Sequence, residues 1–106
     1  MNLNELQKYF VEYSKGYSVD EKDKLALWTL GLAGECGESV ELVKKYIRDK
    51  ALDKTNLTKE LGDVLAYLLL VASYFDITGD EIVQKLVEKT EKRKSNGTRH
   101  GSGNDR

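Results

Sequence analysis

The sequence predicts an all-α fold, in which one four-helix bundle-like domain covers residues 1–94 and a glycine-rich basic tail covers residues 95–106. Three observations support this prediction. The chain has 106 residues, which suits a single domain, and it contains no proline. Apolar residues recur at the spacing of amphipathic helices. No alternating pattern typical of strands stands out, so we expect four helices joined by short polar loops.

The first two helices are expected from about Asn4 to Tyr13 and from about Asp20 to Arg48. A loop that contains Gly16 separates them, because glycine favours turns over helix interiors. The second helix has apolar residues at helical spacing, which predicts an amphipathic helix with one apolar face. These residues are Leu27, Leu30, Ala33, Val40, Val43 and Ile47.

The third helix is expected from about Leu57 to Phe75, and its second half, LAYLLLVASYF, is apolar on nearly all sides. Such a helix is buried within a subunit or between subunits. The fourth helix follows Thr78, which is expected to form a capping box with Glu81, and runs to about Lys94. Four of its apolar residues are expected to face inward, namely Ile82, Val83, Leu86 and Val87.

Composition and charge narrow the range of functions. The chain is 40% hydrophobic and 33% charged, as in an ordinary globular domain. Its single cysteine, Cys36, excludes an internal disulfide and favours a reducing compartment. The N-terminus has no signal-peptide pattern, and the longest apolar stretch, residues 64–72, is too short to span a membrane. We therefore expect a cytoplasmic protein without a membrane partner.

Nucleic acid is not an expected partner. The formal net charge is −1, and none of the predicted helices has a basic face with interleaved aromatic residues. Basic residues are concentrated instead in the C-terminal segment from Lys92 onward.

Two pairs of acidic residues are the strongest functional signal in the sequence. Glu35 and Glu38 lie three positions apart in the second predicted helix, and Glu60 and Asp63 lie three positions apart in the third. Residues at this spacing share one face of a helix, and a short loop makes the two helices antiparallel neighbours. Four carboxylates that face one another inside a protein repel, and a divalent cation would offset this repulsion. Magnesium, which prefers oxygen ligands, is the cation that the pattern favours.

Three glycines of the second helix, Gly31, Gly34 and Gly37, adjoin these acids. Glycine in a helix interior costs about 1 kcal/mol relative to alanine, so its presence needs a reason. The missing side chains would let another helix or a ligand approach the backbone beside the acids. The alternative is that both carboxylate pairs face solvent, as acidic residues on helices usually do.

The segment GLAGECGE, followed by KELGDVLAYLLLVA, closely resembles the MazG-like all-α nucleoside triphosphate pyrophosphatases. The signature of that family is E-x-x-E, a spacer and then E-x-x-D, which here correspond to Glu35, Glu38, Glu60 and Asp63. The C-terminal segment EKTEKRKSNGTRHGSGNDR also resembles a small single-domain group of this family. The resemblance covers roughly residues 25–106.

The resemblance implies a helical fold that associates as a homodimer or as a homotetramer. It implies hydrolysis of a nucleoside triphosphate between the α and β phosphates, to the monophosphate and pyrophosphate, with Mg²⁺ as the cofactor and Mn²⁺ as a substitute. The matching acids, Glu35, Glu38, Glu60 and Asp63, would be the metal ligands. Glu38 is also our candidate for the catalytic group that orients the attacking water. The expected role is house-cleaning of the nucleotide pool.

Substrate contacts are expected from aromatic and basic side chains. Trp28 lies two helical turns before Glu35 and is a candidate to stack on a nucleobase, with a place in the core as the alternative. Cations are needed near the phosphates, and a basic tail could close over them. The candidates are Lys89, Lys92, Arg93 and Arg106. For each of these cations the alternative is a solvated side chain.

A non-catalytic protein is the alternative to an enzyme. In that case the third helix would assemble a helical oligomer, and the basic tail would bind a partner or nucleic acid. The two hypotheses differ in the expected effect of alanine at Glu35 or Asp63. The binding module would tolerate the change or become more stable, whereas the enzyme would lose metal-dependent turnover and keep its fold.

Overall fold

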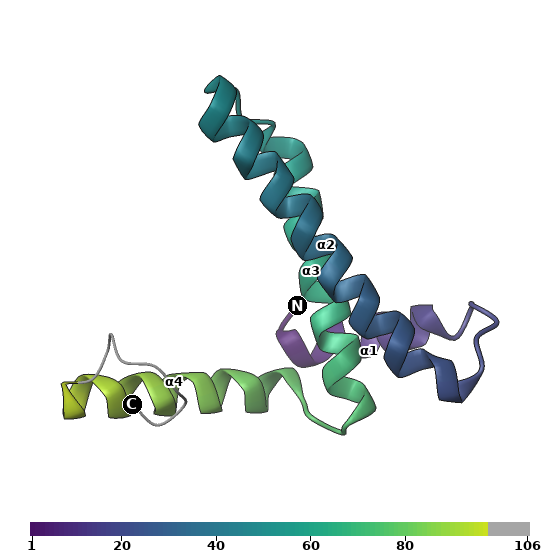
Figure 1. Cartoon of the computed structure of the whole chain (residues 1–106). Coiled ribbons are helices and arrows are strands. Elements are labelled where there is room, and N and C mark those ends of the chain that lie inside the picture. Colours follow the sequence, from purple (N-terminus) through teal and green to yellow (C-terminus); the bar gives the residue numbers. More distant parts are fainter. Residues whose placement is uncertain (98–106) are drawn as a thin grey trace.

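The computed structural model describes residues 1–97 and contains four α-helices (Figure 1). They are α1 (Leu3–Ser14), α2 (Glu21–Asp49), α3 (Lys54–Tyr74) and α4 (Gly79–Asn96). Residues 1–97 contain no strand, so the predicted all-α class with four helices is confirmed. Most of the predicted tail, from residue 98 to residue 106, lies outside the described residues.

Side-chain caps explain where α3 and α4 begin. α3 begins three residues before the predicted Leu57, because the Asp53 carboxylate accepts a hydrogen bond from the backbone N–H of Asn56 at 3.0 Å. At α4, the Thr78 hydroxyl accepts a hydrogen bond from the backbone N–H of Glu81 at 3.1 Å, as predicted. The Glu81 carboxylate in turn accepts a hydrogen bond from the Thr78 hydroxyl at 3.3 Å. Local sequence signals therefore set both helix starts.

α2 and α3 form a long antiparallel hairpin, and α1 packs across one end of α3 (Figure 1). The hydrophobic residues that are buried lie on α3, where they form the core of the chain. They are Ala66, Leu69, Leu70 and Ala72, of which Leu69 has no exposed surface. The core therefore begins one turn after the second predicted acid pair and fixes α3 relative to its neighbours.

A buried glutamine joins α1 to the corner between α3 and α4. The side-chain amide nitrogen of Gln7 donates hydrogen bonds to the backbone carbonyls of Leu69, at 3.1 Å, and Ile77, at 2.9 Å. Its amide oxygen accepts a hydrogen bond from the backbone N–H of Gly79, at 3.1 Å. This N–H belongs to the first turn of α4 and has no partner within that helix. One side chain of α1 thus satisfies three backbone groups at the corner.

The start of α4 also packs closely on α1. The backbone N–H of Asp80 donates a hydrogen bond to the side chain of Asn4 at 2.8 Å. A Cβ atom at Gly79 would lie 2.7 Å from the Cβ of Leu3, so only glycine allows this approach. α3 and α4 meet at 99°, and α4 therefore extends away from the hairpin (Figure 1).

The predicted inward orientation of the apolar residues of α4 is wrong within one chain. Val83, Leu86 and Val87 are exposed, Leu86 to 57%, and Ile82 alone of the four is half-buried. The reason is the direction of α4, whose main packing partner is α1. Helical periodicity identifies an apolar face but not the molecule that covers it. The bundle-like arrangement of one chain is therefore open along α4.

α2 likewise exposes much of its predicted apolar face. Leu30, Val40 and Ile47 are 68%, 65% and 64% exposed. The side of α2 that is partly covered carries Trp28 and Leu32 instead. α2 therefore carries apolar side chains that its own chain leaves uncovered.

Within residues 1–97, no single helix is long and apolar enough to cross a bilayer. By length and composition alone, α3 and α4 meet the requirement together, but the bend of 99° separates them.

The hydrogen bonds of Gln7 predict that Gln7→Leu destabilises the fold. Buried backbone groups would lose their partners, at a cost of about 1–3 kcal/mol in the free energy of unfolding. Chemical denaturation with both variants at equal protein concentration measures this cost. Gln84→Leu, the same change at an exposed position of α4, should alter stability by no more than about 0.5 kcal/mol. Equal stability of the two variants would contradict the role assigned to Gln7.

Candidate functional site

The α2–α3 hairpin brings three of the four candidate acids into one group. One carboxylate oxygen from each of Glu35, Glu38 and Glu60 lies within 4.8 Å of the other two. Asp63 is outside this group, one helical turn beyond Glu60 on α3, and its side chain is exposed. We call Glu35, Glu38 and Glu60 the acidic group.

The acidic group contains carboxylate oxygens that are buried and have no hydrogen-bond donor. They are Oε2 of Glu35 and Oε2 of Glu60, whereas Glu38 is exposed at the outer side of the group. A buried carboxylate oxygen without a donor or cation is unfavourable, because it has lost its water. These two oxygens therefore identify a place where a proton or a cation would be stabilised.

Proximity also changes the protonation of the acidic group. The pKa of Glu38 is raised above its ordinary 4.5, first by hydrogen bonding with Glu60, then by repulsion from Glu60 and by partial desolvation, with a smaller repulsion from Asp63. The pKa of Glu60 is also raised, first by hydrogen bonding with Glu35. Two carboxylates can form such a bond only when one retains a proton, so the fully ionised group has none. Without a cation, Glu38 and Glu60 therefore hold protons at a higher pH than ordinary glutamates do.

The acidic group fits a divalent cation with a preference for oxygen. All of its donors are carboxylates, they approach one another from two helices, and two of their oxygens lack partners. Magnesium and manganese take such ligands, and magnesium keeps part of its water shell when it binds them. The exposed side at Glu38 leaves room for that water and for phosphate oxygens.

An aromatic pocket of about 450 Å³ lies beside the acidic group, between α1, the start of α2 and α3. Its walls include the rings of Phe10, Tyr13, Trp28 and Tyr67, and Asp63 lies on its lining. The volume is within the range of small-molecule sites. Asp63 therefore links the pocket to the acidic group, since its charge also raises the pKa of Glu38 and Glu60. We call this cavity the aromatic pocket.

Trp28, the predicted base-stacking residue, is half-buried in this pocket. The ammonium group of Lys24 lies 6.0 Å from the centre of its ring and forms an ion pair with Glu21 at 2.7 Å. Trp28 thus lines a cavity and is partly covered, and its stacking on a base stays a prediction.

The three glycines of α2 differ in their surroundings. A Cβ atom at Gly31 would overlap the ring of Tyr67, whereas nothing lies within 4 Å of one at Gly34 or Gly37. The expectation that missing side chains allow a close approach therefore applies at Gly31 within one chain. The approaching group is an aromatic side chain of α3.

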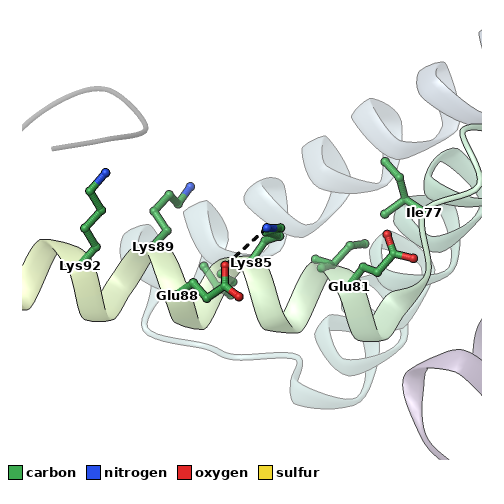
Figure 2. Close-up of a pocket in the computed structure, with 8 residues that line it drawn as sticks. Ile77, Glu81, Lys85, Glu88, Lys89 and Lys92 are labelled. Atoms are coloured by element: carbon green, nitrogen blue, oxygen red, sulfur yellow. Dashed lines mark hydrogen bonds and ion pairs between the residues drawn. The ribbon is translucent and has the colours of Figure 1, made fainter.

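The candidate phosphate-binding cations lie apart from the acidic group in one chain. Lys89, Lys92 and Arg93 belong to α4, which extends away from the hairpin (Figure 1). Figure 2 shows Lys89 and Lys92 along α4. Both line a hollow of about 750 Å³. Arg106 lies outside the described residues. A single chain thus assembles the acids and the aromatic pocket without the cations of α4.

The contribution of α1 to the pocket was not anticipated as part of the site. The rings of Phe10, Tyr13 and Tyr17 line the pocket, and the hydroxyls of Tyr13 and Tyr17 lie 3.0 Å apart. The available signal was the clustering of aromatic residues in the first helix and the loop after it. Periodicity alone predicts that such residues belong to a buried face of the helix. It does not show whether the neighbouring helices leave a cavity beside that face.

Comparison with known proteins agrees with this geometry. The family model of the MazG nucleotide pyrophosphohydrolase domain matches residues 24–98, which include all four candidate acids. The Gene 37 protein of Mycobacterium phage L5 is 36% identical to the chain over 92 residues, which is 82% of this chain and 81% of that protein. No solved structure gives a significant match. Because the family model covers more than half of the sequence, the chain belongs to the MazG nucleotide pyrophosphohydrolase family.

Proposed function

We propose that the protein is a Mg²⁺-dependent nucleoside triphosphate pyrophosphohydrolase, which cleaves its substrate between the α and β phosphates. The products are a nucleoside monophosphate and pyrophosphate. The observation that carries this proposal is the position of the acidic group, with its unpartnered buried oxygens, beside an aromatic pocket of nucleoside size. House-cleaning of the nucleotide pool in the cytoplasm remains the predicted role.

Glu35, Glu38, Glu60 and Asp63 would hold the metal in this proposal. Bound Mg²⁺ supplies charge neutralisation for the triphosphate and acidifies a coordinated water. Glu35 and Glu60 are the half-buried members, and the packing of α2 on α3 fixes their positions. Mn²⁺ takes the same type of ligand and would substitute for Mg²⁺.

Glu38 is suited to act as the general base. It is exposed at the outer side of the acidic group, where a water molecule can approach it. In the proposed step Glu38 accepts a proton from the attacking water. The new P–O bond forms as the bridge between the α and β phosphates breaks, and pyrophosphate leaves.

The aromatic pocket would hold the nucleoside. Trp28 and Tyr67 offer ring faces for stacking on a base. Asp63 lies at the same pocket and next to the acidic group, so a base in the pocket would direct its phosphates toward the acids. The pocket and the acids together thus match the two ends of a nucleotide.

We also propose that the protein acts as a homodimer or homotetramer. The support is the exposed apolar surface of α2, α3 and α4, which a second copy would cover. The exposed residues include Leu30, Val40, Ile47, Leu61, Leu86 and Val87. Because α4 extends away from its own hairpin, its cations Lys89, Lys92 and Arg93 would serve the acidic group of another copy. Arg106, in the basic tail, would add a further phosphate contact.

The catalytic proposal predicts that Glu38→Gln lowers kcat by about 10²–10⁴-fold, the usual contribution of a general base. The fold and the oligomeric state should stay unchanged. The measurement is release of pyrophosphate and monophosphate from ribo- and deoxyribonucleoside triphosphates, with Mg²⁺ and with a chelator. Glu41→Gln is the matched control, because Glu41 is an exposed carboxylate one turn further along α2 and outside the acidic group.

Two results would contradict this prediction. If Glu41→Gln lost as much activity as Glu38→Gln, the acidic group would have no special role. If the folded, assembled wild type hydrolysed none of these nucleotides with Mg²⁺ or Mn²⁺, the catalytic proposal would fail. The alternative of a non-catalytic helical oligomer that binds a partner would then be favoured.

The raised pKa values of Glu38 and Glu60 predict that the metal-free protein gains stability as the pH falls from neutral. Between the raised values and the ordinary 4.5, the folded state binds more protons than the unfolded state. The free energy of unfolding therefore rises as the pH falls through this window. Below the ordinary 4.5 both states are protonated, so the gain is complete and stays constant. Thermal denaturation in chelator across this range measures the gain.

Glu38→Gln serves as the comparison for this pH effect. Its free energy of unfolding should rise less than that of the wild type as the pH falls. Groups outside the site contribute equally to both proteins, among them Asp49, whose pKa is lowered by its hydrogen bonds with Arg48. An identical pH profile for the two proteins would show that Glu38 does not titrate with its neighbours.

The proposed use of α4 cations between copies predicts complementation. Glu38→Gln and the double variant Lys89→Ala/Lys92→Ala should each be nearly inactive alone. In a mixed dimer, one site carries both defects and the other site is intact. Random mixing makes about half of the dimers mixed, so roughly a quarter of all sites, and of the wild-type activity, should be restored. The measurement is turnover after the two variants are unfolded, mixed and refolded together. Mixtures no more active than either variant would place these lysines at the site of their own chain or outside any site.

A further inference from the structure

Gly31 and Tyr67 form a contact between α2 and α3 that depends on the absence of a side chain. A Cβ atom at Gly31 would lie 2.6 Å from Cζ and 2.7 Å from Cδ1 of the Tyr67 ring, closer than real Cβ atoms approach their neighbours. The ring therefore lies directly against the backbone of α2. Gly34, one turn further along the same helix, has nothing within 4 Å of an added Cβ.

This contact lies at the boundary between the aromatic pocket and the acidic group. On α2, Trp28 precedes Gly31 by three positions and Glu35 follows it by four, so the three residues share one face. On α3, Tyr67 follows Asp63 by four positions, and both line the pocket. Because the Tyr67 ring contacts α2 at Gly31, the contact lies between the positions of Trp28 and Glu35 along that helix.

We propose that Gly31 is a positioning residue that sets the width of the aromatic pocket and thereby the size of base that the site accepts. The part of this inference that concerns the base rests on the proposed function. Glycine is a poor residue for a helix interior, and here it gives the Tyr67 ring its place against α2. A side chain at position 31 would push the ring away from α2, and the space on the other side is the pocket that the ring already lines.

The consequence is a narrower pocket in Gly31→Ala. The ring of Tyr67 would move toward Trp28 and the rings of α1. A purine, which has two fused rings, would lose more of its space than a pyrimidine. The contact of Tyr67 with α2 and the selectivity between bases would therefore change together.

A double-mutant cycle tests the contact itself. The proteins are the wild type, Gly31→Ala, Tyr67→Ala and the variant with both changes. Gly31→Ala should lower the melting temperature by about 5 °C or more, whereas the same change in the Tyr67→Ala background should raise it, because alanine is the better helix former. Gly34→Ala is the matched control and should cause no loss, since a Cβ there meets nothing within 4 Å.

The fluorescence of Trp28 reports on the same pocket independently of stability. Trp28 is the only tryptophan in the chain, and it lines the pocket with Tyr67. Its emission should shift in Gly31→Ala and stay unchanged in Gly34→Ala. A Gly31→Ala protein with wild-type emission and the stability of Gly34→Ala would overturn the inference. If Gly31→Ala fails to fold, the protein with both changes decides. Folding of this protein supports the contact. Its failure to fold, while Tyr67→Ala alone folds, overturns the contact.

Binding of non-hydrolysable nucleotides tests the effect on base size. The α,β-methylene analogues of dATP and dCTP are titrated with Mg²⁺ into wild type, Gly31→Ala and Gly34→Ala, with Trp28 emission as the readout. Gly31→Ala should weaken binding of the purine analogue at least about 10-fold more than that of the pyrimidine analogue, a ratio typical of a small misfit in a pocket. Equal weakening of both analogues would reduce Gly31 to a purely structural residue.

The two experiments also separate this inference from the proposed function. If the wild type binds neither analogue and hydrolyses no nucleotide, the proposed function fails and the role in base size fails with it. The double-mutant cycle then still decides whether Gly31 holds the Tyr67 ring against α2. If the wild type binds and hydrolyses nucleotides while Gly31→Ala keeps its selectivity between bases, the base-size inference alone is wrong.

Discussion

Repulsion among the carboxylates of α2 and α3 is the constraint on which the rest of the structure depends. Three glutamates hold oxygens within 4.8 Å of one another, and Glu35 and Glu60 each have an oxygen that is buried without a donor. Like charges at this distance separate unless packing holds their helices together. The core of α3 supplies that packing, since it begins at Ala66, three positions after Asp63. Within residues 1–97, the buried apolar core therefore lies next to the repelling carboxylates.

The direction of α4 connects the stability of the chain to its assembly. Gln7 satisfies backbone groups of both α3 and α4, so the 99° angle between these helices is held by buried hydrogen bonds. A helix fixed in that direction cannot cover the apolar face of its own hairpin. A second copy can cover that face and α4 together, and the stability of such a protein depends on its concentration. This arrangement is the support for the proposed oligomer, in which each copy would complete its neighbour.

The sequence predicted the features that depend on local spacing and missed those that depend on the direction of a helix. The capping residue Thr78 marks the start of α4. The spacing of the acids in two antiparallel helices predicts that Glu35, Glu38, Glu60 and Asp63 meet, and the structure brings the first three together. Periodicity predicts that Val83 faces inward, but Val83 is exposed. The reason is that periodicity does not show which molecule covers a face. Gln7 gave no signal, because in sequence a buried glutamine looks like an exposed one. The pocket was missed for a similar reason, since its walls come from three helices.

The order of residues along the two helices explains why one surface can serve both metal and base. α2 presents Trp28, Gly31 and Glu35 in sequence, and α3 presents Tyr67 and Asp63 in the opposite direction. Along the hairpin the residues of the aromatic pocket therefore adjoin the acids, as the base and the phosphates adjoin in the nucleotide that we propose as substrate. Asp63 belongs to both the pocket and the electrostatics of the acids. Under the proposed function, a substitution that reshapes the pocket near Asp63 would also alter the charge environment of Glu38 and Glu60, so we expect base selectivity and metal affinity to change together.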